Sequence, residues 1–197
     1  YPKRGEMFIG AYVEGCIIAI NHLCDALIAQ DKPGKIAGTS AQAQTARTKL
    51  LAAEVLYSQG RAKEAAEQSD QAFALTEALQ LAEPEKSSRI FDHAQSEFWV
   101  GYGKFRNASY SAAEENFAHY AALAARLVEL DPGNLAWRAE RASALTNLGA
   151  VRLQLLHTDA ALMDFQAAAT DQNQVIAGQP ALETFAGEVE RSKQRTK

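Results

Sequence analysis

Two stretches of the sequence decide the fold: GYGKFRNASYSAAEENF, residues 101–117, and GAVRLQLLHTDAALMDF, residues 149–165. Each begins with a glycine, has an alanine twelve residues later and ends with a phenylalanine. The two stretches are 48 residues apart, and the same step leads from Pro84 to Pro132 and on to Pro180. A fixed interval between marked residues indicates an internal repeat, which is sought before single elements are assigned.

Each period contains two stretches with apolar residues at helical spacing, separated by residues typical of turns. The predicted helices cover residues 41–58, 62–81, 85–106, 110–130, 135–155 and 158–173. Asp131-Pro132-Gly133-Asn134 separates two of them, because proline fits a first helical turn and interrupts the helix before it. Ser111 and Glu114 have the spacing of a capping box that opens the helix at 110–130.

The small residues of the repeat indicate close packing of helices. Gly101 and Gly149 on the first helices of two copies are expected to face Ala113 and Ala161 on the second helices. Helix axes approach closely only where such small side chains allow it. The phenylalanines one turn after these alanines are predicted to fill a groove made by the next pair.

The chain on either side of the repeats has a different character. Residues 1–40 contain a predicted helix at 5–29 and a linker at 31–40. That helix is either the second half of a truncated repeat or an unrelated helix packed on the end. Its apolar face consists of Ile9, Val13, Ile17, Ile20, Leu23, Cys24, Leu27 and Ile28. Residues 181–197 predict a capping helix whose polar remainder, 186–197, suits the end of a helical stack.

Composition and charge exclude several classes of partner. The net charge of −4 gives no basic surface of the kind that nucleic acid requires. The most apolar stretch, residues 7–29, is interrupted by Glu14 and Asp25, and we therefore expect no membrane span. Cys16 and Cys24 lie about 12 Å apart along one predicted helix, too far for a disulfide between them. No targeting segment is recognised, and a cytoplasmic location is expected.

The sequence offers no recognisable catalytic pattern. The four histidines, His22, His93, His119 and His157, lie on separate predicted helices or turns, and none has the spacing of a metal-binding pair. Glycine-rich phosphate loops, nucleophile elbows and paired carboxylates in apolar surroundings are not recognised either. We therefore predict no enzymatic activity, no metal and no cofactor.

Four segments resemble the signature of tetratricopeptide repeats. They are Asn147-Leu148-Gly149, Gln59-Gly60-Arg61-Ala62-Lys63-Glu64-Ala65, Leu130-Asp131-Pro132-Gly133-Asn134, and Ala161 followed by Phe165 and Ala168. The resemblance covers residues 41–185. The usual unit of the family is about 34 residues, and the longer period resembles the long-helix versions in kinesin light chains and bacterial multidomain signalling proteins. It implies an all-α, right-handed superhelical solenoid of antiparallel helix pairs, with about three repeats and a terminal capping helix.

The resemblance also implies a concave groove, lined by first helices, that binds a partner peptide or helix. The candidate groove residues are Arg47, Glu54, Gln95, Phe98, Tyr102, Arg106, Thr146, Asn147 and Gln154. Phe98 and Tyr102 are the expected anchors, because aromatic residues often dominate interface energetics. The preferred function is a protein-binding module within a larger multidomain protein. The alternative is a structural domain that self-associates into a homo-oligomer, with the groove filled by the N-terminal helix or by another copy of the chain.

Overall fold

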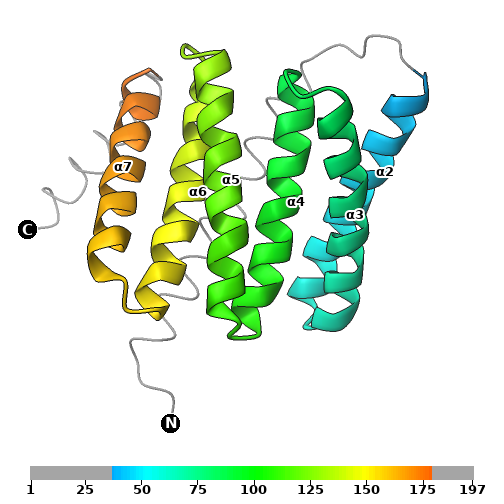
Figure 1. Cartoon of the computed structure of the whole chain (residues 1–197), viewed down its shortest axis with the longest axis horizontal. Helices are drawn as coiled ribbons and strands as arrows, with labels where there is room; N and C mark the ends of the chain where they lie inside the picture. Colours follow the sequence, from blue (N-terminus) through cyan, green and yellow to red (C-terminus); the bar gives the residue numbers. More distant parts are fainter. Residues whose placement is uncertain (1–36, 179–197) are drawn as a thin grey trace, which may run out of the picture.

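The described part of the chain is a succession of helix pairs. The structure is a computed structural model that describes residues 37–178, and within this range it contains six helices and no strand. The helices are α2 (Ala37–Ser58), α3 (Ala62–Ala82), α4 (Ser87–Arg106), α5 (Tyr110–Leu130), α6 (Leu135–Gln154) and α7 (Thr158–Ala177). Figure 1 shows them side by side in chain order, from α2 at one end to α7 at the other. The predicted all-α class is confirmed.

Each helix packs against the helices that precede and follow it in the chain. Residues 59–61, 107–109 and 155–157 join the two helices of a pair, and residues 83–86 and 131–134 join successive pairs. Connections this short make neighbouring helices antiparallel. We call α2, α4 and α6 the first helices and α3, α5 and α7 the second helices. α2 also contacts α4, whereas α3 makes no comparable contact with α5.

The turn inside each pair has the same backbone conformation. Gly60, Ala108 and Leu156 have positive φ angles of 75°, 58° and 61°, and they are spaced 48 residues apart. Each donates its N–H to the carbonyl three residues earlier, and the following residue donates to the carbonyl five residues before it. These two bonds make the Schellman motif, which ends a helix and redirects the chain. The repeat seen in the sequence is therefore also a repeat of the backbone.

The alanines at the repeat positions occupy equivalent environments. Ala65, Ala113 and Ala161 are each fully buried, with no exposed surface. Each is the fourth residue of its second helix. The prediction that Gly101 and Gly149 face Ala113 and Ala161 is not confirmed, because the side chains nearest to a Cβ at these glycines are those of Phe117, Asn116 and Phe165.

The phenylalanines that follow these alanines pack within their own pair. A Cβ atom on Gly101 would lie 2.9 Å from the ring of Phe117, and one on Gly149 would lie 2.8 Å from the ring of Phe165. The prediction that these rings fill a groove of the next pair is therefore wrong. The physical reason is that glycine opens a space on the first helix, and the nearest large side chain of the same pair fills it.

Some predicted boundaries are also corrected. Ser111 and Glu114 do not form a capping box, because α5 begins at Tyr110 and Ser109 is its N-cap residue. The Schellman turn has already fixed the start of this helix, and the Glu114 carboxylate pairs with Arg152 instead. α2 begins at Ala37, within the predicted linker 31–40. Asn134, by contrast, caps α6 by accepting hydrogen bonds from two backbone N–H groups.

Several predictions fall outside the described residues. They concern the helix at 5–29, both cysteines, the capping helix at 181–197 with its remainder 186–197, and the part of the 41–185 repeat region that follows Gly178.

Candidate functional site

The nine residues predicted to bind a partner all lie on the first helices. They are Arg47 and Glu54 on α2, Gln95, Phe98, Tyr102 and Arg106 on α4, and Thr146, Asn147 and Gln154 on α6. Arg106 and Gln154 are exposed, Phe98 and Asn147 are buried, and the other five are partly exposed. The predicted residues therefore do not form a uniformly accessible surface.

Phe98 belongs to the core and does not serve as an exposed anchor. Its side chain is 2% exposed, and its ring centroid lies 5.8 Å from that of Tyr120 and 6.3 Å from that of Phe117. The predicted exposure of Phe98 is wrong because aromatic side chains of α5 enclose this position. Asn147 is also buried, and its Nδ2 donates to the Ser143 carbonyl at 2.9 Å.

Tyr102 and Arg106 form a pair near the C-terminal end of α4. Arg106 Nη1 donates to the Tyr102 hydroxyl at 3.0 Å, and the guanidinium carbon lies 5.8 Å from the centroid of the tyrosine ring. The Tyr102 ring also makes an edge contact with Trp99, at a centroid distance of 5.6 Å. A cation resting on an aromatic face is a common element of protein interfaces.

Polar side chains link successive first helices at equivalent positions. Arg47 on α2 donates to Asp92 on α4, with Nε to Oδ1 at 2.7 Å and Nη2 to Oδ2 at 3.2 Å. Gln95 on α4 donates from Nε2 to Glu140 Oε1 on α6 at 2.5 Å. The donors are 48 residues apart, as are the acceptors. The same type of bond therefore connects α2 to α4 and α4 to α6.

The acceptors of these links are buried carboxylates. Glu140 has no exposed surface, and its Oε1 also accepts a bond from the Tyr120 hydroxyl at 2.6 Å. The side chain of Asp92 is 2% exposed and lies 4.0 Å from Arg89 as well as near Arg47. A buried carboxylate is tolerated only where donors or cations compensate for its lost hydration. These acids therefore constrain how one first helix is placed against the next.

Burial shifts the pKa values of two side chains in this region, Asp92 and His93. Desolvation raises the pKa of the Asp92 carboxyl above its ordinary value, although the hydrogen bond and charge of Arg47 act in the opposite direction. Desolvation also lowers the pKa of the His93 imidazole, and the nearby charges of Glu97 and Glu77 partly oppose this effect.

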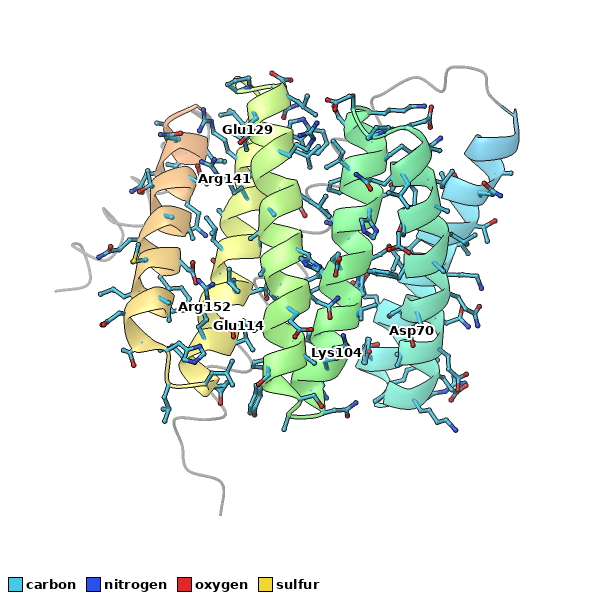
Figure 2. The ribbon with its side chains drawn as sticks, viewed as in Figure 1. Asp70, Lys104, Glu114, Glu129, Arg141 and Arg152 are labelled. Atoms are coloured by element: carbon cyan, nitrogen blue, oxygen red, sulfur yellow. The ribbon has the colours of Figure 1, made fainter. Side chains whose placement is uncertain are left out.

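A second set of ion pairs joins first helices to second helices. Arg152 on α6 donates to Glu114 on α5 at 2.9 Å and to both carboxylate oxygens of Asp164 on α7, at 2.8 and 3.0 Å. Figure 2 shows Arg152 beside Glu114, and Arg141 further along the same helix. Arg141 makes two 2.6 Å bonds to the buried Asp171 of α7. α6 is thus tied through arginine to the second helices on either side.

Sequence reasoning missed one cluster of titratable side chains. Glu97 on α4 is 3% exposed, and its carboxylate accepts from Asn116 Nδ2 at 2.5 Å. His119 Nδ1 lies 3.1 Å from the same carboxylate, and His93 Nε2 lies 3.9 Å from it. No single-sequence signal joins these residues, because they meet across two helices. Within residues 37–178, no group of His, Cys, Asp or Glu side chains is arranged to hold a metal ion.

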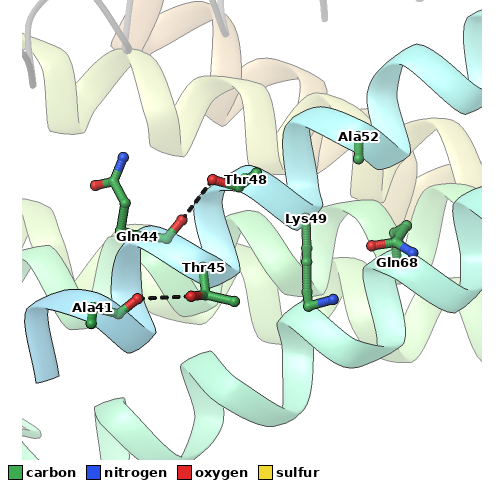
Figure 3. Close-up of a pocket in the computed structure, with 7 residues that line it drawn as sticks. All are labelled: Ala41, Gln44, Thr45, Thr48, Lys49, Ala52 and Gln68. Carbon is green, nitrogen blue, oxygen red and sulfur yellow. Dashed lines mark hydrogen bonds between the residues drawn. The ribbon is translucent and has the colours of Figure 1, made fainter. Parts of the chain in front are cut away.

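One shallow hollow is lined by none of the predicted groove residues. It is formed by α2 and α3, and its lining consists of Ala41, Gln44, Thr45, Thr48, Lys49, Ala52 and Gln68 (Figure 3). Two of its hydroxyls are used within α2, since Thr45 donates to the Ala41 carbonyl and Thr48 to the Gln44 carbonyl, both at 2.9 Å. The lining contains no carboxylate, which makes it a poor candidate for acid–base chemistry.

The geometry defines a class: the described residues belong to an all-α protein built from repeated helix pairs. None of its described helices has both the length and the apolar character needed to cross a lipid bilayer. Comparisons of the chain with protein-family models, curated proteins and solved structures find no match.

Proposed function

We propose that the chain is a protein-binding module of the tetratricopeptide type, in which the first helices line the concave side of a right-handed superhelical solenoid. In this proposal, a peptide or helix of a partner protein lies across α2, α4 and α6. The 48-residue recurrence of turns, buried alanines and first-helix links supports it, because stacked repeats generate an extended surface that suits polypeptide ligands. The cytoplasmic location remains a prediction from the sequence.

The surface proposed for the partner consists of the accessible residues of the predicted set. They are Arg47, Glu54, Gln95, Tyr102, Arg106, Thr146 and Gln154. The Tyr102–Arg106 pair is the proposed centre of recognition, because it combines an aromatic ring with a planar cation. Phe98 contributes from beneath by packing against Tyr102, at a ring-centroid distance of 6.0 Å.

The test is partner capture followed by a direct affinity measurement. Partners recovered with the wild-type chain would be purified and titrated by calorimetry against wild type, Arg106→Glu and Gln154→Arg. Charge reversal at Arg106 is expected to weaken binding at least tenfold, which corresponds to about 1.4 kcal/mol. Glu67→Arg and Gln166→Arg, which alter exposed residues of the second helices, serve as matched controls and should bind normally.

Two results would overturn the proposal. One is a partner whose affinity is unaffected by both first-helix variants. The other is a partner whose binding is lost equally in the second-helix controls, since the recognition surface would then lie on the opposite side of the helix pairs.

A further inference from the structure

One surface of α2 is open although its counterpart on α4 is buried and its counterpart on α6 is buried except at Arg141. We call it the α2 end surface; it consists of Gln44, Thr45, Thr48, Leu51 and Val55, all of which are exposed. Positions 48 residues later on α4 are Asp92, His93, Ser96, Trp99 and Gly103, all of which are buried. The contrast is largest for two apolar residues, because Leu51 is 55% exposed and Val55 is 53% exposed.

The covered counterparts show what kind of element fits this surface. On α4, the Ser96 hydroxyl lies 2.9 Å from the Thr76 hydroxyl of α3. The ring of His93, also on α4, contacts the ring of Phe73 on α3. On α6, Glu140 receives the hydroxyl of Tyr120 from α5. In both cases the second helix of the preceding pair covers part of the surface. On α4 the preceding first helix covers the rest, since Arg47 of α2 bonds Asp92 and Tyr57 of α2 stacks on Trp99 at a centroid distance of 5.9 Å. The molecule therefore contains two examples of the docking geometry that α2 lacks among the described residues.

We propose that residues 14–31 of this same chain cover the α2 end surface, in the place that α3 occupies on α4. One 48-residue step before α3 leads to residues 14–34, and Pro33 would end a helix shortly before that limit. This segment carries apolar residues at helical spacing, which are Ile17, Ile20, Leu23, Cys24, Leu27 and Ile28. The inference does not depend on the proposed function.

Connection length and chemistry agree with this occupant. Only residues 32–36 separate the segment from the start of α2 at Ala37, and the described pairs are joined by the similarly short stretches 83–86 and 131–134. Such a short connection favours an antiparallel neighbour for α2. The end surface carries no charged side chain, so apolar residues facing it would leave no ion without compensation.

The repeat assigns a specific contact that can be tested by cross-linking. Ile28 and Thr48 are the counterparts of Thr76 and Ser96, whose hydroxyl oxygens are 2.9 Å apart, a spacing compatible with a disulfide between cysteines at the two positions. The test variant is Ile28→Cys/Thr48→Cys in a Cys16→Ser/Cys24→Ser background. The positive control is Thr76→Cys/Ser96→Cys, and the negative control is Ile28→Cys/Gln166→Cys, in the same background.

All variants would be checked by circular dichroism and oxidised at low protein concentration, and the products followed on non-reducing gels and by mass spectrometry. The 28/48 pair is expected to form an intramolecular disulfide at least tenfold faster than the 28/166 pair. Adding Leu51→Asp and Val55→Asp to the 28/48 variant should slow the reaction at least fivefold. The proposal is overturned if the 28/48 pair reacts no faster than 28/166, or if its disulfide joins two chains, which would identify a second copy as the occupant.

Discussion

Leu156 occupies a backbone conformation that leucine adopts with difficulty. Its φ angle is 61° and its side chain is 85% exposed, so little packing compensates for the conformational cost. Leu156→Gly is therefore expected to stabilise the fold by about 0.5–1 kcal/mol, even though glycine also gains freedom in the unfolded state. Urea unfolding followed by circular dichroism measures the change.

The reciprocal substitution provides the control for Leu156. Gly60 has a φ angle of 75° at the equivalent turn, and Gly60→Ala should cost about 1 kcal/mol. If Leu156→Gly destabilised the chain while Gly60→Ala had no effect, the two turns could not share the conformation described.

Gly101 is a residue at which added volume should be poorly tolerated. An alanine Cβ would lie 2.9 Å from the ring of Phe117, which is itself 2% exposed and cannot move aside. Gly101→Ala is expected to reduce the free energy of unfolding by about 1–2 kcal/mol, because overpacking exceeds the gain in helix propensity. Gly133→Ala is the matched control, since its Cβ would meet only an aspartate oxygen at 3.8 Å. Equal stability of the two variants, measured by thermal unfolding, would contradict this prediction.

His93 should make the stability of the chain depend on pH. Burial lowers the pKa of His93 below that of the same side chain in the unfolded chain, which is about 6.5. As the pH falls through about 6.5, the unfolded state therefore binds a proton before the folded state does, and stability decreases until the folded pKa is reached. Above that range the imidazole is neutral in both states and contributes no pH dependence.

Chemical unfolding at several pH values between 7.5 and 5.5 tests the role of His93. The wild-type chain is expected to lose stability over this interval, and His93→Gln should show a smaller loss. Glu97, Glu77 and His119 face the imidazole and remain present in both proteins. An identical slope in the two proteins would assign the pH dependence to another group.

At the scale of the helix, periodicity and turn chemistry made the fold predictable. The helix at 110–130 was predicted with its observed bounds, because Pro132 marks its end and a turn before Tyr110 marks its beginning. The start of α2 was missed because Pro33, Gly34 and Gly38 indicated a loop, whereas α2 begins at Ala37 and includes Gly38. Local sequence signals locate a helix more securely than its first turn.

The candidate site was only partly predictable, for a reason that also lies in helix packing. The sequence placed Phe98 on the same helix face as Tyr102, but it could not show that Phe117 and Tyr120 enclose the first ring. The link from Arg47 to Asp92 was not foreseen, because its partners lie 45 residues apart on different helices. The 48-residue step does relate Asp92 to Glu140, and both residues are acidic. This correspondence was the only sequence signal that could have indicated the links between first helices.

The link between α2 and α4 can be tested with a double-mutant cycle. Arg47→Met would leave the buried Asp92 carboxylate with only Arg89, at 4.0 Å, and should cost about 2 kcal/mol. Arg47→Met combined with Asp92→Leu should recover most of that loss, because no uncompensated charge remains. Urea unfolding of the four proteins gives the coupling energy. A double variant as unstable as Arg47→Met alone would show that the ion pair itself, and not the unpaired charge, determines the effect.

At the scale of the molecule, equivalent interfaces imply that a complete helix pair can be added. A second copy of residues 87–134 can be inserted after Asn134. The copy contains the Schellman turn at Ala108 and the buried Ala113, and its Gln95 would again lie opposite Glu140. We expect a monomer with proportionally higher helical content and a single cooperative unfolding transition, since repeat stability is approximately a sum over units and interfaces. Circular dichroism and size-exclusion chromatography measure these properties.

An insertion that breaks the register is the control for this experiment. A copy of residues 87–130 omits the connection at 131–134 and displaces every later contact by four residues. This variant should aggregate or unfold over a broad range. If both insertions behaved alike, the regular interval would have no structural importance.

The sequential pattern of contacts has a mechanical consequence. Each described helix packs against its neighbours in the chain, and α2 also contacts α4. A pulling force applied to the two ends of the helix stack is therefore transmitted through these interfaces one after another. The weakest interface then yields first while the remaining helices keep their shape. Under tension such a molecule would lengthen in discrete steps and shorten again as each pair re-forms, which gives it the behaviour of a spring.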